Sequence, residues 1–516
     1  MRALRNQLTA VFDSTIAALA PGHACGLAIR RLPRDPVRAV TLLGDVAKRH
    51  ASPAAFHLGD CYREGRGVPQ HLPSAAFWYR RAASLGDIRA ARCLAQLHLS
   101  GRYEPAADRP PPLLAPAGQT RADYATALHW AEIAAQGGDA EAQAIMGFIL
   151  GNGPAEMRDL SGSEAWYARA AGQGFARGRL GLAVSLIMRD ADNGDWQRAR
   201  GELALAAEEG LAEAHYLLGL SAEAALGTTR DAKAARRFYE TAAEGGIVAA
   251  QARLGFMLLD GLGGRANRQS AETWLRRAAM GGHQEAAALV GTFYTGEGPL
   301  PPNYAEAMTW FRTAAEGGHS GAAHRLGLLY LHGLGGLRDE QAATDWLKLA
   351  AEHGDALARF NYAVCLMKGV GVPADEREAT RLLSLSAETL PLAQYWYGRA
   401  LADGQGVTQD AAAACVWFAR AATAGVAEAQ LVLADCLLRG RGVERSLEAA
   451  EAWLRKAAAG GQTGALFTLG LLHAGEYGHA VDRAEACRWF ESAATAGSPL
   501  VRRMIEILEP VTAAPP

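Results

Sequence analysis

The sequence predicts an all-α protein, an α/α superhelical solenoid of about twelve stacked helix pairs that are each close to 36 residues long. Three observations predict it. A glycine or alanine recurs at a spacing near 36, an alanine lies five residues before each of these anchors, and a tryptophan lies nineteen residues after most of them. A period of this length is typical of repeat arrays and not of separate globular domains.

The anchors mark the first helix of each repeat. Large apolar residues lie just before the anchors and recur three residues after them, so positions −5, −1 and +3 trace one buried helical face. A Gly-x-Gly turn such as Gly65 and Gly67 then ends the helix, because glycine adopts the left-handed cap conformation at little cost. The predicted anchors are Gly59, Ala95, Gly147, Gly181, Gly219, Gly255, Gly291, Gly327, Ala363, Gly398, Ala434 and Gly470.

The second helix of each repeat carries the tryptophan, followed by an Ala-Ala pair and a closing glycine. The pattern is clear in repeat seven, where Trp310 precedes Ala314 and Ala315. Small residues let neighbouring helices approach, and the glycine ends the unit. We expect the tryptophans to lie in the core, so that Trp310→Ala costs about 3 to 5 kcal/mol locally and makes unfolding multi-step.

The combined pattern A-x-x-x-L-G-x-x-Y, G-x-G-V and W-x-x-x-A-A-x-x-G resembles the Sel1-like repeats, relatives of the tetratricopeptide repeats. The resemblance covers roughly residues 36 to 508. It implies antiparallel helix pairs in a right-handed superhelix whose first helices line a concave, partner-binding groove. It implies no particular partner.

The predicted domains are a capping segment at 1–35, the solenoid at 36–498 and a closing helix with a tail at 499–516. Residues 5 to 19 read as an amphipathic helix that caps the array or docks on a partner or membrane surface. Residues 36 to 49 read as half a repeat. The proline-rich insertion at 102–121 is either a tolerated surface loop or a partner-binding segment.

Two repeats depart from the pattern. Repeat four lacks the glycine turn, has Glu202 where tryptophan is expected, and contains an acidic string at 190–195 whose spacing does not fit a calcium loop. Repeat nine has Leu382 for tryptophan and Pro391 near the place of the closing glycine. We expect a bend in the superhelix near residues 380 to 395.

Composition excludes several classes of function. A net charge of −2 provides no global field for nucleic acid, and no apolar run is long enough to span a membrane. The seven cysteines show no metal-ligand or paired spacing, and no nucleotide-binding or catalytic motif occurs in a suitable context. We therefore expect no cofactor, no metal and no enzymatic activity.

The leading hypothesis is a cytoplasmic adaptor or scaffold of a bacterium, in signalling or in envelope or secretion assembly. Two other classes stay open: an exported, cysteine-bridged relative that acts at the cell surface or toward a host, and an enzyme with an unrecognised pocket.

The partner should lie along the exposed face of the first helices, at positions −2 and +1. An arginine row with steps of about 20 Å would suit an acidic segment, and a tryptophan beside an arginine has the character of a binding hot spot. The alternative is that these are solvated side chains around a half-buried tryptophan. The predicted partner-binding residues are Arg179, Arg253, Arg325, Asn361, Trp396 and Arg399.

Overall fold

The computed structural model describes residues 21–49, 52–101, 122–189, 195–296 and 301–496. It confirms the all-α solenoid: the described residues form helices joined by short turns, with no strand among them. The predicted capping helix at 5–19, the insertion at 102–121, the acidic string up to residue 194 and the closing helix and tail lie outside the described residues.

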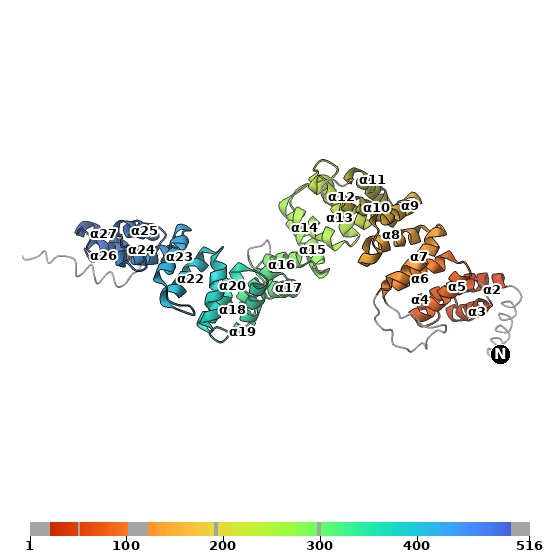
Figure 1. Ribbon diagram of the computed structural model, residues 1–516, viewed down its shortest axis with the longest axis horizontal. Helices are drawn as coiled ribbons and strands as arrows, with labels where there is room; N and C mark the ends of the chain where they lie inside the picture. Colours follow the sequence, from red (N-terminus) through yellow and green to blue (C-terminus); the bar gives the residue numbers. More distant parts are fainter. Residues whose placement is uncertain (1–20, 50–51, 102–121, 190–194, 297–300, 497–516) are drawn as a thin grey trace, which may run out of the picture. The chain divides into compact units, whose positions relative to one another are not determined.

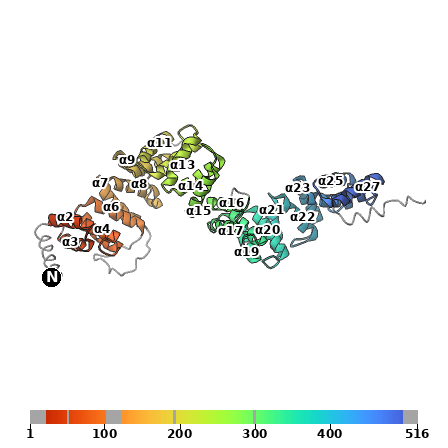
Figure 2. The ribbon, with the colours of Figure 1, turned by 180° about the vertical axis from the view of Figure 1, so that it is seen from behind.

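The chain divides into two compact units, Met1–Asn267 and Arg268–Pro516. In each unit the hairpins stack side by side in sequence order (Figures 1 and 2). The first unit contains α2 (Pro21–Arg31), α3 (Pro36–Lys48), α4 (Ser52–Glu64), α5 (Leu72–Ser84), α6 (Ile88–Ser100), α7 (Tyr124–Gln136), α8 (Ala140–Asn152), η1 (Ala155–Met157), α9 (Leu160–Gly172), α10 (Ala176–Arg189), α11 (Trp196–Glu208), α12 (Ala212–Ala224), α13 (Ala232–Glu244) and α14 (Val248–Asp260).

The second unit continues the same order. It contains α15 (Arg268–Met280), α16 (Gln284–Phe293), α17 (Tyr304–Glu316), α18 (Ser320–His332), α19 (Glu340–Glu352), α20 (Ala356–Lys368), α21 (Glu376–Ala387), α22 (Pro391–Asp403), α23 (Ala411–Thr423), α24 (Ala427–Arg439), α25 (Leu447–Ala459), α26 (Thr463–His473) and α27 (Arg483–Thr495). In the ninth repeat α21 has twelve residues, and α22 begins one residue early at Pro391. The bend near residues 380 to 395 stays a prediction.

Helix α2 is a feature that the sequence did not indicate. It packs against α3, so the segment from Pro36 to Arg49 is the second half of a hairpin that begins at Pro21. Ala24 and Ala28 of α2 are fully buried in the first core cluster. The stack of hairpins therefore starts before residue 36.

In several repeats the anchor glycine makes room for one large ring. A methyl group added to Gly291 would lie 2.8 Å from the ring of Phe311, and one added to Gly398 would lie 2.8 Å from that of Phe418. Both rings are almost fully buried, as is Tyr239. The core residue is thus the one that directly follows the tryptophan, because its ring fills the space that the anchor leaves free.

The prediction that the tryptophans lie in the core is wrong in detail. Every tryptophan of the chain is only partly buried. Trp310, for example, donates its indole N–H to the Glu306 carboxylate at 2.9 Å, and the guanidinium of Arg276 lies 5.5 Å from its ring centre. The tryptophans therefore cover the core from its edge and do not fill it.

The register of repeat four also differs from the prediction. Helix α10 begins at Ala176, and the first helices elsewhere begin seven residues before their anchor, so the structural anchor is Ala183 and not Gly181. Ala183 and Leu182 are buried, and Gly178 takes the place of the usual alanine against Ala170. With this anchor the spacing is 36 residues on both sides, to Gly147 and to Gly219.

Neighbouring repeats are joined through the second glycine of each Gly-x-Gly turn. Gly371 and Gly406 have positive φ and pack directly on the carbonyl groups of Glu340 and Glu376, at the start of the second helix of the preceding repeat. The Thr380 hydroxyl donates to the carbonyl of Gln405 at 2.8 Å across the same junction. The turn is therefore both a helix cap and an inter-repeat contact.

All seven cysteines are free thiols. Burial raises the pKa of Cys61 and Cys93 to about 11 and that of Cys436 to about 12, whereas Cys487 is exposed on α27. A raised pKa lowers the thiolate fraction that reacts with a disulfide reagent.

We therefore expect an aromatic disulfide reagent at pH 8 to modify one thiol quickly in the native chain and all seven in denaturant. Cys487→Ser should remove the fast reaction and lower the number of thiols that react in denaturant from seven to six. Two or more fast thiols in the native chain would contradict the burial described above.

Candidate functional site

Some successive first helices lie close together within each unit. Helix α8 contacts both α6 and α10 in the first unit, and α18 contacts α20 in the second. Among the described residues, successive second helices approach one another less closely. Positions −2 and +1, where Arg253, Arg325 and Arg399 are exposed, define the exposed face of the first helices.

Trp396 is the best-formed part of this face. It is half-buried on α22, with its ring edge-on to Phe360 of α20 at 6.5 Å and to Tyr395 at 6.2 Å. The Lys368 ammonium and the Arg399 guanidinium each lie 6.0 Å from the ring centre. We call Phe360, Lys368, Tyr395, Trp396 and Arg399 the Trp396 cluster.

The chemistry of the Trp396 cluster suits recognition of another protein. Arg399 is exposed and pairs with Asp403 at 3.5 Å, an exposed ion pair that contributes little to stability. A partly buried indole flanked by two cations offers apolar area and charge-assisted hydrogen bonds in one place. The sequence correctly placed Trp396 and Arg399 together, but it did not identify Lys368 or Phe360 as their neighbours.

Asn361 is used to connect two first helices. Its side-chain nitrogen lies 2.8 Å from Nε2 of His324 on α18. Burial is the main cause that lowers the pKa of His324, against an opposing effect of Asp355. Asn361 and His324 therefore form a neutral hydrogen-bonded pair between repeats eight and nine, next to the exposed Arg325.

Arg253 is exposed on α14 and makes an ion pair at 3.6 Å with Glu223 of the preceding first helix. Arg253 belongs to the first unit, whereas Arg325, Asn361, Trp396 and Arg399 belong to the second. The structure brings Trp396 and Arg399 together and leaves the others as separate points along the first helices.

Arg179 does not lie where the sequence placed it. With Ala183 as the anchor, Arg179 is at position −4, and its side chain is only 19% exposed. It forms ion pairs with Glu202 of α11 at 3.6 Å and with Glu209, the residue that follows α11, at 3.4 Å. The predicted row of three equivalent arginines therefore loses its first member.

An apolar cleft that the sequence did not indicate lies beside Arg179, in repeats three and four. It measures about 790 Å³ and is lined by the end of α8, the start of α9 and one face of α10. Leu160, Val184 and Met188 form its exposed apolar wall. The sequence does contain a signal for this cleft. A strict 36-residue spacing puts the anchor at Ala183 and Met188 at an exposed position.

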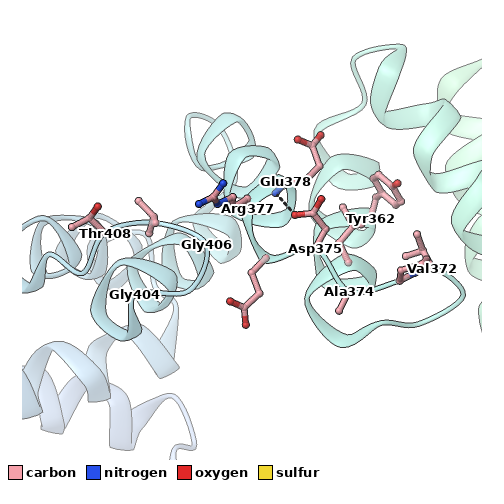
Figure 3. A pocket seen from close by; sticks show the side chains of 13 residues that line it. Tyr362, Val372, Ala374, Asp375, Arg377, Glu378, Gly404, Gly406 and Thr408 are labelled. Carbon is pink, nitrogen blue, oxygen red and sulfur yellow. Dashed lines mark hydrogen bonds between the residues drawn. The ribbon is translucent and has the colours of Figure 1, made fainter.

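A second, polar cleft of about 1010 Å³ lies between the turns of repeats nine and ten (Figure 3). Asp375, Glu378 and Tyr362 line one side, and Gly404 to Thr408 line the other. The Asp375 carboxylate accepts the backbone N–H of Glu378 at 3.0 Å, and Arg381 lowers the pKa of Glu378. These acidic groups are thus engaged in capping and in an ion pair.

The described residues hold no group of three or more histidine, cysteine, aspartate or glutamate side chains arranged to bind a metal ion. No described helix is both long enough and apolar enough to cross a membrane.

The comparisons with known proteins identify the family. The chain belongs to the Sel1 repeat family, whose model matches more than half of it. The matched residues are 52–87, 116–139, 140–175, 212–247, 248–283, 284–319, 320–355, 356–388, 391–426, 427–462 and 464–498. Residues 176–211 are not matched, yet they form the α10 and α11 pair, so the fold persists where the repeat pattern is weakest.

One solved structure supports the same fold. The chain is similar to c5321, a protective antigen present in uropathogenic Escherichia coli strains displaying an SLR fold, with 24% identity, a TM-score of 0.63, and coverage of 92% of this chain and 99% of that one. It is also similar to a Sel1 repeat protein from Oxalobacter formigenes, with 32% identity, a TM-score of 0.46, and coverage of 60% and 90%.

Among curated proteins, the chain is 35% identical over 132 residues to chitin synthase regulatory factor 3 of Schizosaccharomyces pombe. The match covers 25% of this chain and spans 12% of the length of that relative. Sel1 repeat solenoids generally mediate protein interactions and are generally not catalytic.

Proposed function

We propose that this chain is a non-catalytic scaffold that binds a partner protein along the exposed face of its first helices. The observation that carries the proposal is the Trp396 cluster, a half-buried indole between two cations on that face. Binding hot spots are rich in tryptophan and arginine and combine a desolvated ring with charge. The cations suit a partner segment that is acidic. Arg253 and Arg325 extend the positive character to other repeats, and Arg179 contributes less because α11 occupies it.

The same proposal includes the cytoplasm of a bacterium as the place of action. The free state of all seven thiols supports a reducing compartment. Cell fractionation followed by thiol counting on the recovered protein tests this part, and a recovered disulfide would contradict it.

The proposal predicts that Trp396→Ala combined with Arg325→Ala abolishes co-purification of the partner. Binding by the wild-type chain should weaken about tenfold between low and high salt, because exposed cations are screened. Co-purification and a binding titration at two salt concentrations measure both effects.

The matched control is Trp453→Ala combined with Arg420→Ala. Trp453 is also half-buried and has a cation at 4.2 Å, the Lys456 ammonium, but it lies on the second helix α25. Arg420 is exposed like Arg325, but it lies on the second helix α23. The control should keep the partner, and circular dichroism should show unchanged helix content in both variants. Retained binding by a folded Trp396 and Arg325 double variant would contradict the proposed surface.

A further inference from the structure

The apolar cleft of repeats three and four exposes three large side chains in one place. Leu160 at the start of α9 is 70% exposed, and Val184 and Met188 on α10 are 40% and 76% exposed. Several exposed apolar residues around one concavity mark an interaction site more strongly than single ones do. The cleft is continuous with the exposed face of the first helices, because Val184 lies at position +1 of α10.

Met188 is an exception among the repeats. It lies five residues after the anchor Ala183, and other repeats carry polar or small residues there, among them Glu64, Asp260, Lys368 and Asp403. The array therefore does not need an apolar side chain at this position. Methionine is flexible and polarisable, which suits a surface that adapts to an incoming side chain.

Tyr167 provides the cleft with a hydrogen-bond donor. The equivalent hydroxyl of Tyr79 donates to Asp60 at 2.7 Å, and that of Tyr239 donates to Glu223 at 2.6 Å. Tyr167 lines the cleft and has no hydrogen-bond partner among the residues that the structure describes. Burial raises its pKa to about 12, so the phenol stays protonated and can donate at neutral pH.

The position of Tyr167 follows from the shifted register of repeat four. Gly181 falls at position −2 of α10, and a methyl group there would overlap the Tyr167 ring. Gly147 of α8 contacts the same ring, and a methyl group there would lie 2.8 Å from it. The ring is therefore held between α8 and α10.

The charges around the cleft balance. Glu164 and Arg189 form an ion pair at 3.2 Å, and the two other charged residues of the lining, Arg177 and Glu213, have opposite signs. A balanced rim of this kind favours neither a phosphate nor an anionic lipid headgroup. It fits an uncharged, apolar segment that offers a hydrogen-bond acceptor.

We propose that this cleft binds a short uncharged segment of a partner protein, which inserts one large aliphatic or aromatic side chain between Leu160, Val184 and Met188 while its backbone carbonyl accepts the Tyr167 hydroxyl. The inference rests on the proposed scaffold function and adds a second contact site, distinct in chemistry from the cationic Trp396 cluster. Binding here should be almost insensitive to salt.

The test uses the intact chain with ¹³C-labelled methionine methyl groups and twelve-residue peptides selected on it from a random display library. Met280 is the internal control, because it is 70% exposed on α15 of the other unit. Met188→Leu and Met280→Leu assign the two signals. Selected peptides should shift the Met188 signal and leave the Met280 signal unchanged.

Three variants then test the contacts. Met188→Glu should weaken peptide binding at least tenfold, and Met280→Glu should not change it. Tyr167→Phe keeps the ring and should weaken binding about threefold to tenfold, as the loss of one hydrogen bond does.

Four outcomes would overturn the cleft proposal. In the first two, the selected peptides never shift the Met188 signal, or their binding survives Met188→Glu. In the third, dodecanoate shifts the Met188 signal and no peptide does. In the fourth, the Met188 signal shifts with protein concentration alone. The last two would assign the cleft to a free amphiphile or to a second copy of the chain. Binding that survives Met188→Glu but is lost in the Trp396 and Arg325 double variant would reject the cleft and still support the scaffold.

Discussion

Phe311→Ala should destabilise the second unit by about 3 to 5 kcal/mol, because a fully buried ring is removed and the cavity cannot collapse completely. Gly291 lies against this ring, so the cavity opens directly between α16 and α17. Repeats couple mainly to their nearest neighbours, so the loss should appear as a separate early unfolding step. Urea unfolding followed by circular dichroism, together with hydrogen exchange of α16 and α17, measures it.

Trp310→Ala is the matched comparison for Phe311→Ala. Trp310 is adjacent in sequence, larger, and only half-buried, so its removal should cost about 1 to 2 kcal/mol. This cost is lower than the loss of about 3 to 5 kcal/mol that we expect if the tryptophan lies in the core. Equal losses for the two variants, or a larger loss for Trp310→Ala, would show that the tryptophan is the core residue after all.

Much of the fold could be predicted from the sequence, because each repeat encodes its own helix pair. The alanines five residues before the anchors are fully buried in eleven repeats, from Ala54 to Ala465, as a helical face with that period requires. The glycines that end the first helices, such as Gly333 and Gly369, have the expected positive φ.

The errors arose where two readings of a local pattern were both possible. Glycine is the commoner residue at the anchor and favours Gly181, although Ala183 keeps the 36-residue period and is the buried one. The size of tryptophan favours a place in the core, whereas the neighbouring position, Phe311 or Tyr239, faces the anchor glycine. The repeat signature gives no sign of helix α2, because it begins only after that helix.

The candidate site was harder to predict than the fold. Exposure at position −2 follows from helical geometry, and it holds for Arg253 and Arg325. The partners that a side chain finds on neighbouring helices do not follow from one repeat. The pairing of Asn361 with His324 and the cations around Trp396 depend on how successive repeats pack, which the 36-residue pattern leaves undetermined. The same holds for the Tyr167 hydroxyl, which has no hydrogen-bond partner among the described residues.

The junction between repeats nine and ten gives the second large effect. Gly404 and Gly406 both have positive φ, 72° and 66°. An alanine at position 404 has its nearest neighbour, Cβ of Gln409, at 3.3 Å, whereas an alanine at 406 would overlap the backbone carbonyl of Glu376 in the preceding repeat. Both substitutions pay for the left-handed conformation, but only the second also forces two repeats apart.

We expect Gly404→Ala to cost about 1 to 2 kcal/mol, the penalty of a left-handed alanine. Gly406→Ala should cost about 3 to 5 kcal/mol, because the displacement of packed backbone adds to that penalty. Only Gly406→Ala should increase hydrogen exchange at the start of α21, where the Glu376 carbonyl lies, since the disturbed contact belongs to the neighbouring repeat. The pair Gly440→Ala and Gly442→Ala should repeat the difference one repeat later, because Gly442 packs on the carbonyl of Ala411 in the same way. Equal costs within each pair would mean that the turn glycines act only as helix caps and that the repeats are held together by their side chains alone.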